Sequence, residues 1–424
     1  MRRLISKIGP IGVALLLASF LGYILLAYVA RVLTPNEYSA FQASWGLIFG
    51  FGSALSVVEQ EISRQQANLD FDRSGPNNYP LKVCIISLCA VVPIGVAGLV
   101  SGFFERLSQE LGSIGVYAVL IAVLGFIPQF VVRGVLVGRE EHLQYAALLV
   151  IEPVLRLVAV AVFMYIALRE SLLSYSIVAV ATGSYAFSFF LIPTARFVGR
   201  TECNVSWLSI LRRLAVLGTG IALSAVLITG YPAFVTAIVG TSEGLGSFFT
   251  IVTASRVPLI LVAPIQAVAV PQVVRLIRGG KSRKLAQVVL RSYLLASFCA
   301  IVAFAVGYGC GPLAVHVLFG SQYSPSRFES AIVATATVMI AATQLACACL
   351  VAFERYILLA VGWGTGVAGA YLALTCLPLD LVGRATWALL TGSVMACLMT
   401  GIFVMRQSKK AAKSEHKLSE RSEE

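Results

Sequence analysis

Residues 9–30 read GPIGVALLLASFLGYILLAYVA, an uninterrupted stretch without a charged side chain. A helix of about 20 apolar residues is long enough to cross the ~30 Å hydrocarbon core of a bilayer. A basic start followed by an apolar run is also typical of a secretory signal. However, this run continues to about Val29, and no small-residue cleavage site precedes Arg31. The stretch therefore predicts a retained first membrane span.

Further apolar blocks follow the first one, separated by charged and turn-forming residues. The 424 residues are 58% hydrophobic and 12% charged, with a mean hydropathy of +0.88. Soluble domains carry about 25% charged residues, so this composition cannot supply a soluble surface. The predicted fold class is all-α, a polytopic membrane protein of about 12 transmembrane helices. The expected spans are 9–30, 39–58, 83–102, 113–136, 145–168, 173–195, 213–237, 245–270, 287–309, 329–351, 356–377 and 383–405.

The 32 lysines and arginines are distributed very unevenly between the two sides of these spans. Cytoplasmic loops are enriched in Lys and Arg, and this bias sets the orientation of a membrane protein. We therefore expect a multi-pass protein of the cell (plasma or inner) membrane with the N-terminus and the C-terminus in the cytoplasm. The net charge of +12 would then face anionic lipids on the cytoplasmic side. No feature favours nucleic-acid binding. The outer side holds only Arg31, Arg106, Arg169, Arg327 and Arg384.

The nine cysteines and three histidines show no spacing that is typical of a metal site. Most of the cysteines lie inside apolar blocks, where a thiol behaves as a small hydrophobic group. Cys347 and Cys349 would point to diverging sides of a helix. We therefore predict inert thiols, no metal and no cofactor. The segments between spans are too short to form a separate domain, so the function is expected to lie within the bilayer.

Two similar hairpins occur at corresponding positions in the two halves of the chain. They read ARVLTPNEYSAF at residues 30–41 and AIVGTSEGLGSF at residues 237–248. Six spans in each half keep the same orientation, which predicts an internal repeat about an axis along the membrane normal. The prediction is two pseudo-symmetric six-helix bundles around a central cavity, formed by residues 1–205 and 206–406. Residues 407–424 are expected to form a disordered cytoplasmic tail.

Charged side chains inside or at the ends of the spans are candidates for a functional site. A charge at the centre of a bilayer costs at least ~2.5–3.5 kcal/mol, so it normally faces a cavity or a partner. Arg256 lies well inside its predicted span, and Glu152 and Arg156 have the spacing of an ion pair within one helix. The remaining candidates lie at span ends, where they mark the mouths of a path or snorkel to the interface. These are Arg31, Glu59, Glu61 and Arg64.

Several short motifs resemble the polysaccharide (oligosaccharidyl-lipid) flippases of the multidrug/oligosaccharidyl-lipid/polysaccharide (MOP) flippase superfamily. That family commonly has an aRxLgpeeyGxy hairpin after its first span, which residues 30–41 match except at Ser39, where the family favours Gly. An xRxxa motif at the end of span 2 is matched by residues 63–67. RGVLVG at 133–138 and VLFGSQY at 317–323 are similar to two further junctions of the family.

The resemblance implies a transporter that moves a polyprenyl-diphosphate-linked oligosaccharide from the inner to the outer leaflet by alternating access, for cell-surface polysaccharide biosynthesis. Guanidinium groups pair well with phosphate oxygens, so the expected substrate contacts are arginines. Polysaccharide-assembly enzymes are candidate partners. The substrate-binding candidates are Arg31, Arg64, Arg156 and Arg256, and the candidates for charge balance or for a coupling ion, H⁺ or Na⁺, are Glu59, Glu61 and Glu152.

Other functions are open alternatives. A drug or small-solute exporter and a lipid II flippase belong to the same superfamily and would have the same topology. A membrane glycosyltransferase or polymerase would use acidic residues on sizeable outer loops, whereas here the outer loops are short and aspartate is scarce. We therefore predict that the protein is not an enzyme.

Overall fold

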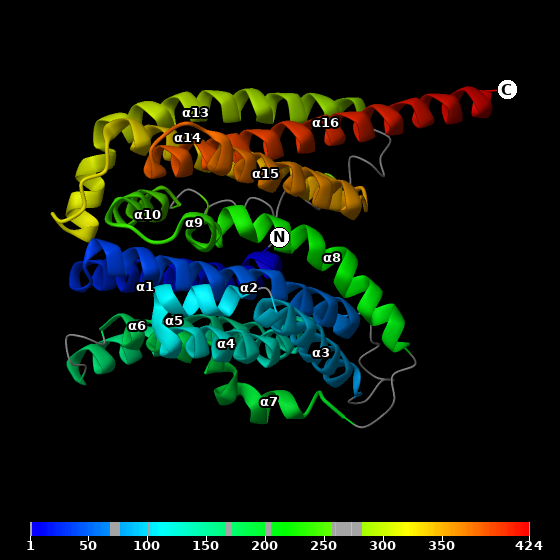
Figure 1. Ribbon diagram of the computed structural model, residues 1–424. Helices are drawn as coiled ribbons and strands as arrows, with labels where there is room; N and C mark the ends of the chain where they lie inside the picture. Colours follow the sequence, from blue (N-terminus) through cyan, green and yellow to red (C-terminus); the bar gives the residue numbers. More distant parts are fainter. Residues whose placement is uncertain are drawn as a thin grey trace. The chain divides into compact units, whose positions relative to one another are not determined.

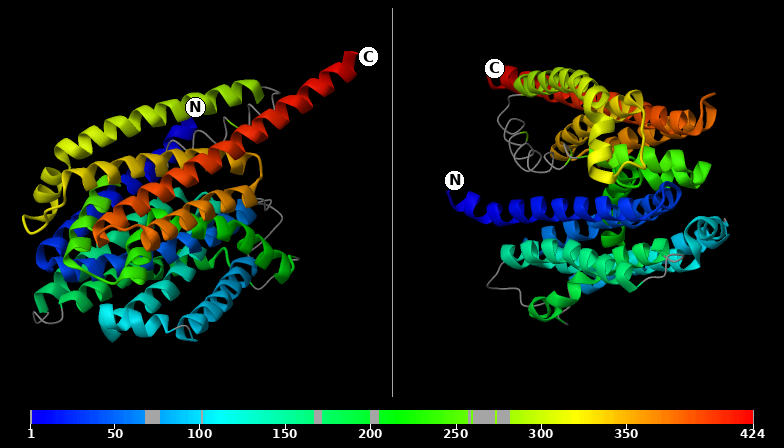
Figure 2. Two further views of the ribbon diagram at one scale, coloured as in Figure 1. Left: turned by 45° about the horizontal axis from the view of Figure 1, so that its top comes forward. Right: turned by 90° about the vertical axis from the view of Figure 1, so that its left-hand side faces the viewer.

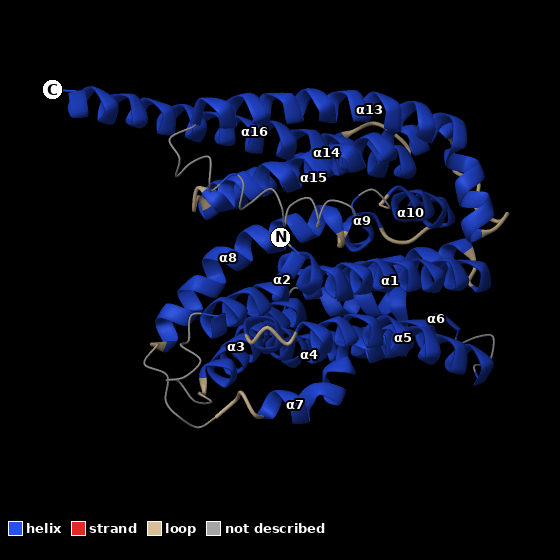
Figure 3. Ribbon diagram, turned by 180° about the vertical axis from the view of Figure 1, so that it is seen from behind, coloured by secondary structure: helices blue, strands red, loops and turns tan. Residues whose placement is uncertain are grey.

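The computed structural model describes residues 2–67, 77–100, 102–166, 172–199, 205–256, 259, 273 and 282–423. These residues are almost entirely helical (Figures 1 and 3). The described part contains no strand, and its only β-type pairing is an isolated bridge between Asn77 and Val198. The predicted all-α class is confirmed.

Ten of the described helices are long and apolar enough to cross a membrane. The two predicted spans that are missing from this set are 83–102, which corresponds to a helix with a shorter apolar segment, and 245–270. The helix in the latter region ends at Ser255, and most of residues 257–272 lie outside the described residues. The chain is therefore a polytopic α-helical membrane protein.

The chain divides into two compact units. The first comprises Met1–Ala225 and Thr229–Gly246, and the second comprises Val226–Ile228 and Ser247–Glu424. The helices within or mainly within the first unit are α1 (Arg2–Val32), α2 (Pro35–Ala67), α3 (Tyr79–Val100), α4 (Phe103–Gly138), α5 (His142–Ile166), α6 (Leu172–Thr182), the 3₁₀ helix η2 (Gly183–Phe190), α7 (Leu191–Ala195), α8 (Trp207–Ile228) and α9 (Tyr231–Val239).

Glycines allow α4 to lie close against α2 in the first unit. A Cβ atom at Gly134 would be 2.8 Å from Cβ of Ile62, and one at Gly138 would be 2.5 Å from Cβ of Gln66. Their spacing is that of a small-xxx-small motif, by which membrane helices approach each other without side chains between them. This close approach brings the polar end of α2 next to α4.

The two hairpins that repeat in the sequence lie against each other in the first unit. A Cβ atom at Gly246 would be only 2.0 Å from the carbonyl oxygen of Pro35, so only glycine fits here. Thr34 caps α2, because its Oγ1 accepts from the Glu37 amide at 3.3 Å while the Glu37 carboxylate accepts from the Thr34 amide at 2.9 Å. Ser242 caps the start of α10 (Glu243–Ser255) in a similar way, because its Oγ accepts from the amide of Leu245.

Four long helices make up most of the second unit: α13 (Ser282–Phe319), α14 (Arg327–Ala352), α15 (Tyr356–Cys376) and α16 (Leu381–Glu423). Within it, α13 and α16 run side by side (Figure 2). Gly366 and Gly392 bring α15 and α16 together, since a Cβ on either one would be less than 3 Å from the carbonyl oxygen of the other. Small residues therefore determine packing in both units.

Two features of the structure concern the predicted domain boundaries. First, α9 packs against α2, where a Cβ at Gly46 would be 2.9 Å from the Ala233 amide nitrogen, and it falls in the first unit. The division into two pseudo-symmetric bundles at residue 206 around a central cavity stays a prediction. Second, α16 continues to Glu423, whereas disorder was expected for 407–424. Extension of an existing helix requires no new nucleation, which accounts for a helical backbone in this polar segment.

Candidate functional site

A group of four polar side chains on α4 and α5 forms a buried cluster inside the first unit, here called the Glu152 cluster: Gln129, Arg133, Glu152 and Arg156. Two of them lie one turn apart on α4, and the other two lie one turn apart on α5. Side chains four residues apart share a helix face, so each helix presents a polar pair to its neighbour. The cluster lies within spans that are otherwise apolar.

The Glu152 carboxylate is the centre of the cluster. Its Oε2 accepts from Nε2 of Gln129 at 2.6 Å and pairs with Nη2 of Arg133. Its Oε1 pairs with Nη2 of Arg156 on the same helix. The spacing-based prediction of an ion pair between Glu152 and Arg156 is therefore confirmed, while the second guanidinium on α4 was not predicted. The charges remain buried because each has a partner.

Arg156 is surrounded by protein groups and is 5% exposed. Its Nε donates to the carbonyl oxygen of Val180 at 3.1 Å, and its guanidinium lies 4.6 Å from the ring centroid of Phe49. On a third side it lies against Gly183, where a Cβ would be 2.3 Å from its Nε. These contacts hold Arg156 in one position between α2, α5 and α6.

A further acidic group, Glu59 on α2, lies beside the cluster. Its Oε1 accepts from the hydroxyl group of Tyr145 at 2.7 Å, and it interacts electrostatically with Arg133. Arg133 is thus attracted to carboxylates on two helices, Glu59 and Glu152. The two positive charges of Arg133 and Arg156 therefore balance the two negative charges of the carboxylates. Two buried atoms, Nε of Arg133 and Oε1 of Gln129, have no hydrogen-bond partner within the described part of the chain. Unsatisfied buried groups of this kind cost about 1–3 kcal/mol each.

A second group, here called the Glu61 cluster, gathers the ends of α2, α3 and α8: Glu61, Arg64, Tyr79 and Arg213. Glu61 is 1% exposed and accepts from the Tyr79 hydroxyl group at 2.6 Å. Nη2 of Arg64 lies 2.8 Å from Oε1 of Glu61, and Nη1 of Arg213 lies 3.4 Å from the same oxygen. The side chains of Arg64 and Arg213 are 49% and 43% exposed. One buried carboxylate therefore holds two accessible guanidinium groups.

The remaining predicted site residues lie elsewhere. Arg31 is exposed in the last turn of α1 and is a member of neither cluster. Arg256 is half-buried and directly follows the end of α10, in a turn in which its amide donates to Thr253 at 3.2 Å. Most of the rest of the predicted span 245–270 lies outside the described residues, so the place of Arg256 within that span stays a prediction. Pro258 lies outside the described residues.

The structure also brings in residues that were not predicted as site members: Tyr79, Gln129, Arg133, Tyr145 and Arg213. Arg133 was noted only as the first residue of the RGVLVG motif. A usable signal was present in α4, where Gln129 and Arg133 are one turn apart in an apolar helix. Among the described residues, no group of three or more His, Cys, Asp or Glu side chains is arranged to hold a metal ion.

Comparison with known proteins finds relatives by sequence and solved structures with a similar fold. No family model matches the sequence. The chain is 28% identical over 401 residues to the uncharacterized protein Rv3630 of Mycobacterium tuberculosis. The matched region covers 92% of this chain and 90% of that protein. It is 27% identical over 397 residues to the uncharacterized protein Rv1510 of the same species, at 91% and 89% coverage.

Solved transporter structures share the helical arrangement of this chain. An inward-facing multidrug resistance MATE family transporter of the MOP superfamily has a TM-score of 0.66 at 15% identity, covering 93% of this chain and 96% of that one. An outward-facing structure of a multidrug resistance MATE family transporter of that superfamily has a TM-score of 0.60 at 16% identity, with 97% and 96% coverage. The protein is a multi-pass membrane protein with the fold of these transporters.

Proposed function

We propose that this protein is a transporter that works by alternating access and moves a polyprenyl-diphosphate-linked oligosaccharide from the inner to the outer leaflet. The fold supports the transporter class, because solved transporters with this helical arrangement adopt inward-facing and outward-facing conformations. The short sequence motifs shared with the oligosaccharidyl-lipid flippases support the cargo class.

The observation that carries the cargo proposal is the pair of accessible guanidinium groups on Glu61. Arg64 and Arg213 carry two positive charges against one carboxylate, so the Glu61 cluster has a net charge of +1 and exposed donors. The planar fork of a guanidinium suits phosphate oxygens. This cluster lies at the end of α2 that the distribution of basic residues assigns to the cytoplasmic side, where the diphosphate of an inner-leaflet cargo would enter.

The other predicted residues receive different roles in this proposal. Arg156 is engaged by protein groups on several sides, so we assign it, together with Glu152, to charge balance inside the first unit. Arg31 and Arg256 remain candidates for contact with the cargo. Glu59 remains a candidate for carrying H⁺ or Na⁺. Among the described side chains, only Tyr145 is identified as donating a hydrogen bond to Glu59. Location in the cell membrane, cytoplasmic termini and contact with polysaccharide-assembly enzymes complete the proposal.

The experiment that tests the cargo class is a translocation assay in vesicles that contain the purified protein. A fluorescent polyprenyl-diphosphate oligosaccharide is placed in one leaflet, and its appearance in the other is measured. Arg64→Gln combined with Arg213→Gln is expected to slow translocation at least tenfold. Arg212→Gln is the matched control, since this neighbouring arginine on α8 is exposed and is not a member of the Glu61 cluster. Equal rates for both variants, or no translocation by the natural sequence, would contradict the cargo assignment.

A second candidate is a drug or small-solute exporter, which the names of the solved structures favour. It predicts that vesicles or cells with the protein extrude cationic dyes and that the oligosaccharide lipid does not compete. A lipid II flippase would also use a diphosphate site, and competition between the two lipid-linked cargoes separates these alternatives.

A further inference from the structure

An open groove runs along the surface of the second unit between α13 and α16, with a volume of about 410 Å³. Its walls are mainly apolar and include Leu290 on one helix and Leu398 and Ile402 on the other. These three side chains are 52%, 58% and 44% exposed. They lie within or beside the membrane-spanning parts of the two helices, where an exposed apolar side chain faces lipid.

The groove is built into the contact between the two helices by one glycine and one tyrosine. A Cβ at Gly401 of α16 would be 2.8 Å from the ring of Tyr293 of α13, so the ring lies directly on the α16 backbone. The Tyr293 hydroxyl group donates to the carbonyl oxygen of Cys397 at 3.1 Å. Below the ring lie fully buried side chains, Leu350 and Val404. These buried side chains, with Tyr293 packed against them, form the floor of the groove.

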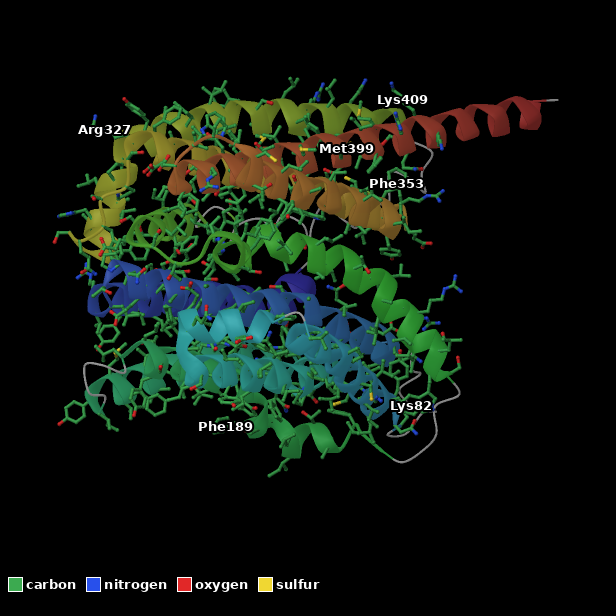
Figure 4. All side chains as sticks on the ribbon, viewed as in Figure 1. Lys82, Phe189, Arg327, Phe353, Met399 and Lys409 are labelled. Carbon is green, nitrogen blue, oxygen red and sulfur yellow. The ribbon has the colours of Figure 1, made fainter. Side chains whose placement is uncertain are left out.

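Two positive charges lie at one end of the apolar groove. Arg406 and Lys409 line it, three residues apart on α16, and Figure 4 labels Lys409 on this helix beyond Met399. In the part of the chain that the structure describes, no carboxylate forms an ion pair with either residue. An anion that sits here would therefore meet two cations that no carboxylate of the described residues neutralises.

The position of the groove along the helices matches the boundary between hydrocarbon and headgroups. In α16 the uncharged run of residues 385–405 ends at Arg406, and in the antiparallel α13 the uncharged run begins after Arg291. The basic end of the groove therefore lies at the polar edge of the membrane and its apolar part lies inside the hydrocarbon. The charge distribution assigns this edge to the cytoplasmic leaflet, which is rich in anionic lipids.

We propose that this groove binds one anionic phospholipid of the surrounding membrane, with its phosphate on Arg406 and Lys409 and one acyl chain on the Tyr293–Gly401 floor. The volume is in the range of pockets for small ligands, ~300–1,000 Å³, and suits part of a single chain. The charge complementarity selects an anionic headgroup over a zwitterionic one. This inference uses the membrane location and the predicted orientation and does not depend on the cargo.

The test uses the full-length protein in lipid nanodiscs that contain phosphatidylglycerol, phosphatidylcholine or both. Native mass spectrometry counts the lipid molecules that stay bound and compares their affinities. We expect one phosphatidylglycerol to be retained in preference to phosphatidylcholine. Arg406→Gln combined with Lys409→Gln should weaken this binding roughly tenfold to thirtyfold, since each basic residue near a membrane contributes about 1 kcal/mol. The matched control is Lys410→Gln, an exposed neighbour that does not line the groove.

A second pair of variants tests the apolar part without changing charge. Leu398→Trp fills the groove and should abolish retention, whereas Leu372→Trp on the lipid-facing side of α15, which is 57% exposed, should not. Three outcomes would each overturn the proposal: equal affinity for the two lipids in the natural sequence, equal losses for the combined Arg406→Gln and Lys409→Gln variant and for Lys410→Gln, or retention by Leu398→Trp. Retention of a prenyl phosphate or of a second copy of the chain in place of phosphatidylglycerol would also overturn it. A transport assay on the same samples reports on the cargo separately.

Discussion

Arg133 of α4 and Glu152 of α5 form an ion pair between helices in the interior of the first unit, with side chains that are only 12% and 8% exposed. The same carboxylate also pairs with Arg156. Buried ion pairs contribute little net stability when intact, because desolvation offsets the attraction. Removal of one partner, however, leaves a buried charge without compensation. The pair therefore makes the relative position of α4 and α5 sensitive to a single substitution.

Glu152→Gln is expected to destabilise the protein by about 3–5 kcal/mol, because two guanidinium groups would lose their shared carboxylate. The measurement is thermal unfolding of the detergent-solubilised protein. Glu105→Gln changes the same charge at an exposed position and should stay within about 0.5 kcal/mol of the natural sequence. If both variants unfold at the same temperature, the buried pair does not hold α4 and α5 together.

Gly183→Ala should also be destabilising, by about 1–3 kcal/mol, because the added methyl group would occupy the position of the Arg156 side chain. Displacement of Arg156 would weaken its contacts with Glu152 and Val180. Gly22→Ala is the matched control, since nothing lies within 4 Å of a Cβ there. Chemical denaturation of both variants in the same detergent compares them, and equal midpoints would refute the close contact.

Tyr79→Phe tests the Glu61 cluster. The substitution removes the hydroxyl group that donates to Glu61 at 2.6 Å. The tyrosine is fully buried. The expected loss of stability is about 1–3 kcal/mol, the range for a buried group that loses a charged hydrogen bond. Tyr117→Phe, at a tyrosine that is 65% exposed, should have almost no effect. Similar unfolding curves for the two phenylalanine variants would contradict this role of Tyr79.

The orientation is tested by reporter fusions. Green fluorescent protein at the C-terminus should fluoresce, and alkaline phosphatase at the same position should be inactive, because the basic segments are expected to face the cytoplasm. A phosphatase fusion truncated at Leu379, in the short connection between α15 and α16, should be active. The opposite pattern would reverse the membrane orientation and would move the Glu61 cluster to the outer side.

The boundaries of many helices could be predicted from hydropathy, since bilayer thickness imposes similar lengths on all spans. The predicted spans 329–351 and 356–377 differ from α14 and α15 by at most two residues at each end. The predicted span 245–270 overlaps α10, which ends at Ser255, and most of the remaining residues of that span lie outside the described part of the chain.

In the candidate site, too, some contacts could be predicted from the sequence and others could not. The Glu152–Arg156 pair could be predicted because both residues lie on one helix at a fixed spacing. Arg133 could not be assigned to Glu152, since the pairing depends on which faces of α4 and α5 meet. Likewise, nothing in the sequence near Arg213 indicates that it shares a carboxylate with Arg64, which is separated from it by about 150 residues.

By itself, the sequence determined the class of the molecule, an all-α polytopic membrane protein, because long uncharged segments can be satisfied only as helices within lipid. It also determined the repeated hairpins at residues 30–41 and 237–248. Only the tertiary structure decided that these hairpins touch at Pro35 and Gly246 and that polar side chains of three helices meet at Glu61. Such contacts depend on how closely the helix backbones approach, and that approach is set by glycines such as Gly134, which hydropathy does not distinguish from other small residues.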